Sequence, residues 1–134
     1  MSSRDGARSV DGAPRVLVVG DEVKLTALIW KALNEQGMPA DFTSSGEPAL
    51  LMATGRAYDV LVLDDSQAGT DPFGVCRRLR ANGVGTPILM LIDGDRIDAR
   101  SAEIDECADD HVAKPFDFND LFARVQRLAM RERD

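Results

Sequence analysis

Three residues that can handle a charged group each stand at the end of an apolar run of this chain. Asp21 comes shortly after the first run, Asp64 ends a central run, and Lys114 follows the last. Two carboxylates at one site repel each other and raise each other's proton affinity unless a cation lies between them. Magnesium suits such a pair, and lysine suits a phosphoryl or carboxylate partner. Asp64 is therefore a candidate phosphoryl acceptor, while a solvated turn acid and an ordinary Lys114 salt bridge remain structural alternatives.

The apolar runs predict the elements that position these side chains. Buried strands are expected at residues 15–19, 60–65 and 88–92, and short strands at 39–43 and 111–113. Helices are expected at residues 22–36, 73–80 and 98–106, and from 118 onward. A further helix is expected to begin after a cap at Ser44 or Ser45 and to end at about residue 54. This alternation favours a doubly wound α/β fold with a parallel sheet and right-handed crossovers. The carboxyl ends of its strands share one edge, where open sheets of this kind bind ligands.

Two helices carry more detailed predictions. The first should bury an apolar stripe and leave Trp30 partly exposed. That stripe consists of Leu25, Leu28, Ile29, Ala32 and Leu33. The fourth has only a weak stripe, made of Ala99, Ala102 and Ile104. Asp117 is expected to cap the last helix.

The composition limits the class of protein. A chain of 134 residues with 44% hydrophobic residues suits one domain with a single core. Its formal net charge of -7 argues against direct binding to nucleic acid, which depends on attraction to phosphate groups. Cys76 and Cys107 fit neither a disulfide framework nor a zinc pattern, and no apolar run is long enough to span a membrane. We expect a reduced, cytoplasmic setting and a disordered leader over residues 1–14.

Several enzyme motifs are missing from the sequence. Gly20 is not followed by the glycines of a dinucleotide-binding loop, and no lysine follows a glycine-rich phosphate loop. A metal-dependent phosphatase of the haloacid dehalogenase type needs an aspartate two residues after the nucleophile, where this chain has Ser66. His111 is the only histidine, which excludes a paired-histidine metal site. We therefore do not expect an enzyme.

Three segments together resemble the receiver domain of bacterial two-component response regulators. They are residues 15–22 (RVLVVGDE), 58–64 (YDVLVLD) and 108–116 (ADDHVAKPF). The resemblance covers residues 15–131 and leaves 132–134 as a tail or the start of a linker. It implies a flavodoxin-like sheet of five strands in the order 2-1-3-4-5, with five helices.

The resemblance also implies a role for individual residues. Asp64 matches the phosphorylated aspartate of the family, and Lys114 matches its phosphate-binding lysine. Asp21, Asp64 and the backbone carbonyl of Ser66 match the magnesium ligands. The bond between Lys114 and Pro115 is often cis in this family.

Several positions depart from the family pattern. A second acid is usual at Gly20, so magnesium binding should be weakened. A hydroxyl residue that contacts the phosphoryl group is usual at Ile92, and an aromatic residue that changes rotamer is usual at His111, so the switch should be degenerate. Asp65 and Asp93 add negative charge that opposes phosphorylation unless a cation compensates. Pro72 and Cys107 replace glycines, and Cys107 is expected at a positive φ.

The resemblance extends to a charged surface of the OmpR/PhoB subgroup. Regulators of this subgroup dimerise through helix 4, strand 5 and helix 5. The residues that would form ion pairs across such an interface are Arg100 with Asp120, Asp110 with Arg124, and Asp109 with Arg131. A solvated charged face is the alternative, because exposed pairs contribute little individually.

Together these patterns predict a signal-receiving domain of a transcriptional response regulator, which reaches DNA only through a domain outside this chain. The expected partners are a second copy of the chain and a sensor histidine kinase, with no membrane partner. Dimerisation is expected to need little help from phosphate. Two alternatives remain open: a receiver that is still weakly phosphorylated at Asp64, and a pseudo-receiver that binds a small ligand or a partner protein without phosphorylation.

Overall fold

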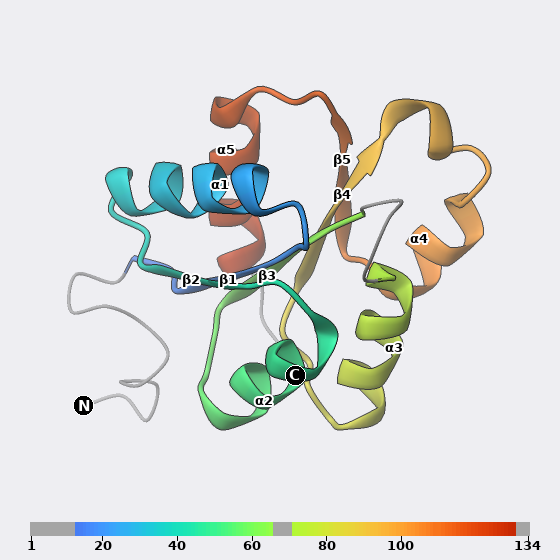
Figure 1. Cartoon of the computed structure of the whole chain (residues 1–134), viewed down its shortest axis with the longest axis horizontal. Helices are drawn as coiled ribbons and strands as arrows, with labels where there is room; N and C mark the ends of the chain where they lie inside the picture. Colours follow the sequence, from blue (N-terminus) through green and yellow to red (C-terminus); the bar gives the residue numbers. More distant parts are fainter. Residues whose placement is uncertain (1–12, 66–70, 131–134) are drawn as a thin grey trace.

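A parallel sheet forms the centre of the molecule (Figure 1), in a computed structural model that describes residues 13–65 and 71–130. Its strands are β1 (Val16–Val19), β2 (Ala40–Thr43), β3 (Val60–Asp64), β4 (Ile88–Asp93) and β5 (Asp110–Lys114). They are ordered β2-β1-β3-β4-β5, and each pair is parallel. The fold class predicted from the sequence is therefore confirmed.

The helices cover both faces of the sheet. They are α1 (Val23–Glu35), α2 (Gly46–Gly55), α3 (Pro72–Ala81), α4 (Ser101–Cys107) and α5 (Phe118–Ala129). In Figure 1, α1 and α5 lie on one side of the sheet, and α2, α3 and α4 lie on the other. A single 3-10 turn, η1 (Gly94–Arg96), connects β4 toward α4. No helix in the described part of the chain is long and apolar enough to cross a membrane.

Two clusters of buried side chains, one on each face, hold these layers together. The central strands β1 and β3 are buried along their whole length, which explains their unbroken Val and Leu runs. One cluster joins the sheet to Phe73, Leu79 and Ile104 on the α2–α4 side. The other joins it to Ile29 and Val125 on the α1 and α5 side. The sheet is thus fixed from both sides, and its carboxyl edge is held in place.

The stripes predicted for α1 and α4 were partly wrong. Leu28 is 51% exposed, whereas Thr26 is buried at 2% exposure because its hydroxyl bonds to the backbone of the preceding turn. The fourth helix begins at Ser101, three residues later than predicted, because the chain first makes η1 and a further turn. Ala99 and Ala102 are therefore exposed. Trp30 is 37% exposed, as predicted.

The helix ends follow the predicted chemistry in most cases. Asp117 caps α5 by accepting a hydrogen bond from the Asn119 N–H. Ser45 occupies the cap position of α2, but its side chain makes no capping hydrogen bond. The Lys114–Pro115 bond is cis. The positive φ expected at Cys107 is wrong, because among the described residues only glycines adopt it; the α4 end is extended instead.

The two cysteines are neighbours inside the α2–α4 cluster. Both are free thiols, and the Sγ of Cys76 donates to the backbone carbonyl of Cys107 over 3.0 Å. Burial raises the pKa of Cys76 to about 12, and the neighbouring Cys107 adds to the rise. The Cys76 thiol is therefore protonated at neutral pH, and the two buried side chains pack α3 against the end of α4.

Candidate functional site

The carboxylate of Asp64 and the ammonium group of Lys114 meet at the carboxyl edge of the sheet. They are the last residues of β3 and β5, which flank β4. The Nζ of Lys114 lies 2.7 Å from Asp64 Oδ1 and donates a 2.9 Å hydrogen bond to the Asp65 carbonyl. The Asp64 side chain is 1% exposed, so water screens this pair poorly. The strand order thus brings the two residues together, as expected, while their roles remain predictions.

The second oxygen of Asp64 has a different environment. Asp64 Oδ2 is buried and makes no hydrogen bond to any residue that the structure describes. Burial raises the pKa of Asp64 most strongly; Lys114 opposes the rise, and the charges of Glu22 and Asp65 add to it. A buried carboxylate oxygen without a donor is costly. It is suited to a cation or to the electrophilic phosphorus of a phosphoryl donor.

The turn after β1 lies beside this oxygen. Val19 pairs with Leu63, so the next residue, Gly20, faces Asp64. A Cβ atom at Gly20 would lie 2.8 Å from Thr26 Oγ1 and 3.1 Å from the Asp64 Cβ. The space for the acid that is usual here is therefore filled by Thr26. Neither this role of Thr26 nor the influence of Glu22 was predicted, although Glu22 directly follows Asp21 in the same acidic turn.

Asp21 and Asp64 are the described residues to which the resemblance assigns magnesium at this edge. Asp21 is half-buried in the turn after β1. No group of three or more acidic, histidine or cysteine side chains suited to a metal occurs in residues 13–65 and 71–130. Ser66, the further ligand implied by the resemblance, lies outside the described residues. Two carboxylates and the open Asp64 Oδ2 fit a cation that keeps most of its waters, as magnesium does.

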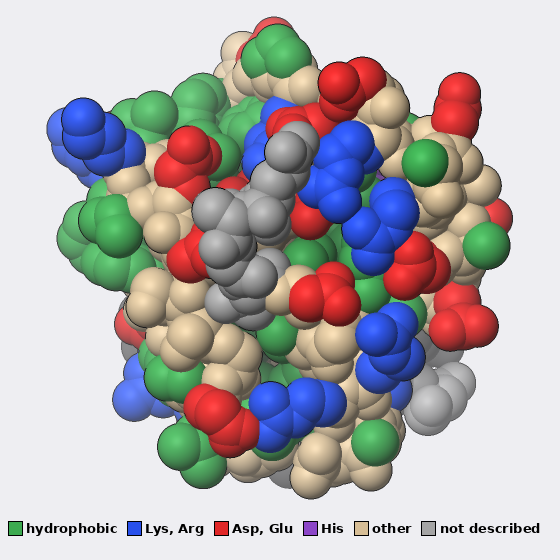
Figure 2. Space-filling model, turned by 45° about the vertical axis from the view of Figure 1, so that its right-hand side comes forward, with side chains coloured by type: hydrophobic (Ala, Val, Ile, Leu, Met, Phe, Trp, Pro, Cys, Tyr) green, Lys and Arg blue, Asp and Glu red, His purple; other side chains and the backbone are tan. Residues whose placement is uncertain are grey.

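The added negative charge of Asp65 is balanced by an arginine. Asp65 is 3% exposed, and its Oδ2 lies 2.6 Å from NH1 of Arg96 in η1. Asp93, the other added acid, lies 3.7 Å from Lys114. The compensating cation that the sequence required is therefore present. Arg96 gave no signal in the sequence, because it stands in a stretch between predicted elements. Figure 2 shows basic and acidic side chains side by side on this face.

The two switch positions are occupied by residues with quite different surroundings. Ile92 is fully buried in the α2–α4 cluster and pairs with Ala113 across β4 and β5. It offers no donor to a phosphoryl oxygen. His111 is half-buried and lines a surface cavity of about 360 Å³ together with Asp120 and Arg124.

The residues expected at the dimer surface bond within the chain. Arg124 binds both oxygens of Asp110, at 2.9 and 3.0 Å, and also Asp120 at 3.0 Å. These contacts raise the pKa of Arg124, with the Asp120 hydrogen bond contributing most. Asp109 instead accepts the N–H of Ile88, at 2.8 Å. Asp110, Asp120 and Arg124 therefore form one charged group on α5 and β5, whereas Asp109 faces the start of β4.

Arg100 and Arg131 complete the expected set. The Arg100 guanidinium lies 4.3 Å over the ring of Phe73 and pairs with Glu103. Asp120, its expected partner on a second copy, bonds to Arg124 within the chain. Arg131 lies outside the described residues.

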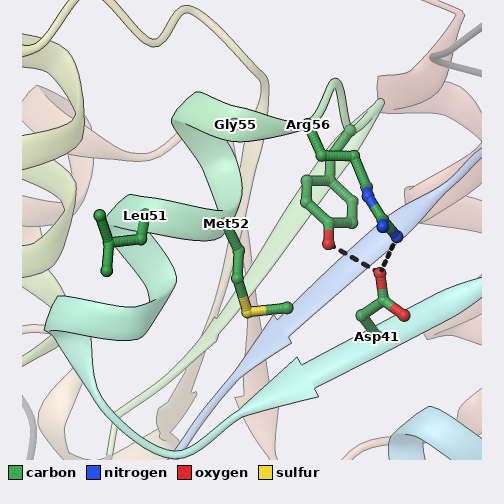
Figure 3. A pocket seen from close by; sticks show the side chains of 6 residues that line it. Asp41, Leu51, Met52, Gly55 and Arg56 are labelled. Atoms are coloured by element: carbon green, nitrogen blue, oxygen red, sulfur yellow. Dashed lines mark hydrogen bonds and ion pairs between the residues drawn. The ribbon is translucent and has the colours of Figure 1, made fainter.

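A further cavity of the described chain is remote from Asp64. It measures about 400 Å³ and lies near the amino ends of β2 and β3 (Figure 3). There the hydroxyl of Tyr58 donates to Asp41 over 2.7 Å, and Arg56 contacts the same oxygen at 3.2 Å. Burial, followed by the interactions with Asp41, raises the pKa of Tyr58 to about 12. This polar cluster ties β2 to β3 and contains none of the predicted site residues.

Comparison with known proteins gives a consistent result. The family model described as the response regulator receiver domain matches residues 16–126. The transcriptional regulatory protein TcrA of Mycobacterium tuberculosis is 44% identical over 117 residues, which are 87% of this chain and 46% of that protein. The transcriptional activator protein IrlR of Burkholderia pseudomallei is 38% identical, over 87% of this chain and 51% of its own length. The chain thus spans about half the length of these relatives.

Solved structures agree with the sequence relatives. The response regulator protein TrrA of Thermotoga maritima, solved in complex with Mg²⁺ and BeF, superposes with a TM-score of 0.75 at 30% identity. That match covers 86% of this chain and 98% of the other.

Proposed function

The chain belongs to the response regulator receiver domain family, and on this premise we propose that it receives a signal as a phosphoryl group on Asp64. The observation that carries the proposal is the geometry of that carboxylate. One oxygen is held by Lys114 at 2.7 Å, and the other is buried without a hydrogen bond among the described residues. This arrangement supports a nucleophile with one free oxygen and a cation beside it.

The proposed reaction transfers a phosphoryl group from a sensor histidine kinase or a small phosphodonor. Asp64 Oδ2 forms a bond to phosphorus while the donor's bond to phosphorus breaks, and the leaving group keeps the electron pair. Lys114 then neutralises part of the negative charge that the acyl phosphate brings. A magnesium ion held by Asp21, Asp64 and the Ser66 carbonyl would stabilise the charge on the transferring oxygens.

Phosphorylation is proposed to be weaker than in an ordinary receiver. Gly20 removes one acid from the metal site, and Ile92 removes one hydrogen bond to the phosphoryl group. A hydrogen bond to a charged group contributes about 1.5–3 kcal/mol, so each loss is large enough to matter. The Arg96 cation offsets the charge of Asp65, which supports a working acceptor rather than a dead one.

The proposed output is control of transcription through a DNA-binding domain elsewhere in the protein. The region of TcrA and IrlR that resembles this chain is about half of each protein's length, which supports a second domain in those relatives. The charged group of Asp110, Asp120 and Arg124 supports a homodimer through α4, β5 and α5. A cytoplasmic location follows from the proposed kinase partner.

Intact mass after incubation with acetyl phosphate and magnesium tests the acceptor. We expect one added phosphoryl group on the parent chain and none on Asp64→Asn. Asp105→Asn, which makes the same chemical change on the exposed side of α4, serves as the matched control and should still be modified. No addition to the parent, under conditions that modify an ordinary receiver, would overturn the proposal and favour a pseudo-receiver that responds to a ligand or partner.

A further inference from the structure

Two ion pairs of opposite polarity hold the connection between β4 and α4 to the acceptor site. At its start, Asp93 Oδ1 lies 3.7 Å from Lys114 Nζ. At the end of η1, Arg96 NH1 lies 2.6 Å from Asp65 Oδ2. Lys114 also contacts Asp64, so both pairs include or adjoin the acceptor. The segment therefore carries one acidic and one basic side chain. Added negative charge at Asp64 would repel Asp93 and attract Arg96.

The pair of Asp65 and Arg96 is close and largely buried, but its hydrogen-bond geometry is poor. The Asp65 side chain is 3% exposed and that of Arg96 is 25% exposed. Despite their short separation, Asp65 Oδ2 and Arg96 NH1 make no hydrogen bond of good geometry with the described residues. Arg96 thus retains donor capacity beside Asp65, the residue that follows the acceptor, and a guanidinium offers several N–H groups in the planar arrangement that matches phosphoryl oxygens.

A phosphoryl group on Asp64 would compete for this arginine. Asp64 and Asp65 are consecutive, with Cα atoms about 3.8 Å apart. An acyl phosphate places more negative charge and more acceptor oxygens at Asp64 than the carboxylate of Asp65 provides. We propose that Arg96 binds the phosphoryl group of Asp64, in place of the hydroxyl missing at Ile92, and carries the signal to α4. This inference rests on the proposed function.

The position of Arg96 in the chain connects it to α4. Ile97, the next residue, packs against the α2–α4 cluster. Arg100 lies over the ring of Phe73, and α4 begins at Ser101. A shift of Arg96 from Asp65 toward Asp64 therefore moves a short segment whose next contacts are with α3 and α4. Asp93 is released at the same time, because Lys114 is drawn toward the added charge.

A double-mutant cycle on Asp65 and Arg96 tests this inference. Beryllium fluoride, which mimics a phosphoryl group, is titrated at saturating magnesium into the parent, Asp65→Asn, Arg96→Gln and the double variant by calorimetry. If Arg96 binds the added group, Arg96→Gln weakens binding roughly tenfold in both the Asp65 and the Asn-substituted background. Asp65→Asn alone tightens binding, because it frees Arg96 and removes a negative charge.

The cycle separates this role from simple charge balance. If Arg96 only neutralises Asp65, Arg96→Gln has no effect once Asp65 is replaced by Asn, and that result would overturn the inference. Arg77→Gln removes one positive charge from an exposed position on α3 and should leave the affinity unchanged. No binding to the parent would overturn the proposed function itself. The double variant leaves no buried acid unpaired, so it remains testable if Arg96→Gln alone unfolds.

Hydrogen exchange supplies the second readout. In the parent, beryllium fluoride should change amide exchange across residues 94–107, whereas in Arg96→Gln at saturating ligand that segment should not respond. An equal change in both proteins would show that the signal reaches α4 by another route and would contradict the relay.

Discussion

The hydroxyl of Thr26 donates a 3.2 Å hydrogen bond to the carbonyl of Gly20 and lies where a side chain at residue 20 would begin. Gly20→Asp alone should therefore fail to restore strong magnesium binding, because its Cβ would meet Thr26 Oγ1 at 2.8 Å. Gly20→Asp combined with Thr26→Ala removes that clash and should tighten magnesium binding by about tenfold over the parent.

Calorimetric titration of magnesium into both variants and into Thr26→Ala measures the effect. An equal gain from Gly20→Asp alone would show that the turn adapts without help from residue 26.

Neutralising the acceptor should stabilise the fold at neutral pH. Because the pKa of Asp64 is raised in the folded state, its charged form is disfavoured there. The contribution of Asp64 to the free energy of unfolding is therefore fully present below the unfolded pKa of the carboxyl group. It is lost as pH rises through the folded pKa. Asp64→Asn should melt higher at pH 7, by about 4 °C for each kcal/mol relieved, with the difference vanishing in acid. A gap between the two melting curves that grows toward low pH would contradict this sign.

Tyr58 provides a titration that can be read without interference from another tyrosine, because it is the only one in the chain. Its absorbance should titrate with a midpoint at about 12 instead of 10.0. The folded state holds the phenol proton more tightly, so stability is intact below pH 10.0 and is lost as pH rises toward about 12. In Asp41→Asn the midpoint should fall, because the charge and hydrogen bond of Asp41 are gone. An unchanged midpoint would show that burial alone raises the pKa of Tyr58.

Arg124 is the residue through which the proposed dimer can be tested. Arg124→Glu places an acid beside Asp110 and Asp120 and should abolish concentration-dependent dimerisation in sedimentation velocity. Because these contacts are partly exposed, the monomer should lose only about 1 kcal/mol of stability. Arg77→Glu, the same charge reversal on α3, should leave the sedimentation profile of the parent unchanged. Identical sedimentation profiles for Arg124→Glu and the parent would contradict a dimer that forms through α4, β5 and α5.

The elements and the central pair could be predicted because they depend on patterns along the chain. The apolar run that ends at Asp64 specifies a buried strand, and the parallel order of the strands then places Lys114 at the same edge. The burial of Thr26 and exposure of Leu28 could not be predicted, since helical spacing does not show which polar side chain has a partner below it. Arg96 was missed for a related reason: its contact with Asp65 depends on the path of a turn, and no periodicity specifies that path.

The buried cysteines of α3 and α4 provide a natural probe of local opening. Because burial raises the pKa of Cys76 to about 12 and both thiols lie inside the cluster, a maleimide can react only while α4 is detached from α3. The rate of alkylation at neutral pH thus counts openings of the α4 side in unmodified protein, without any introduced label. Comparing the alkylation rate before and after phosphorylation would therefore measure whether the phosphoryl group changes how often α4 separates from α3.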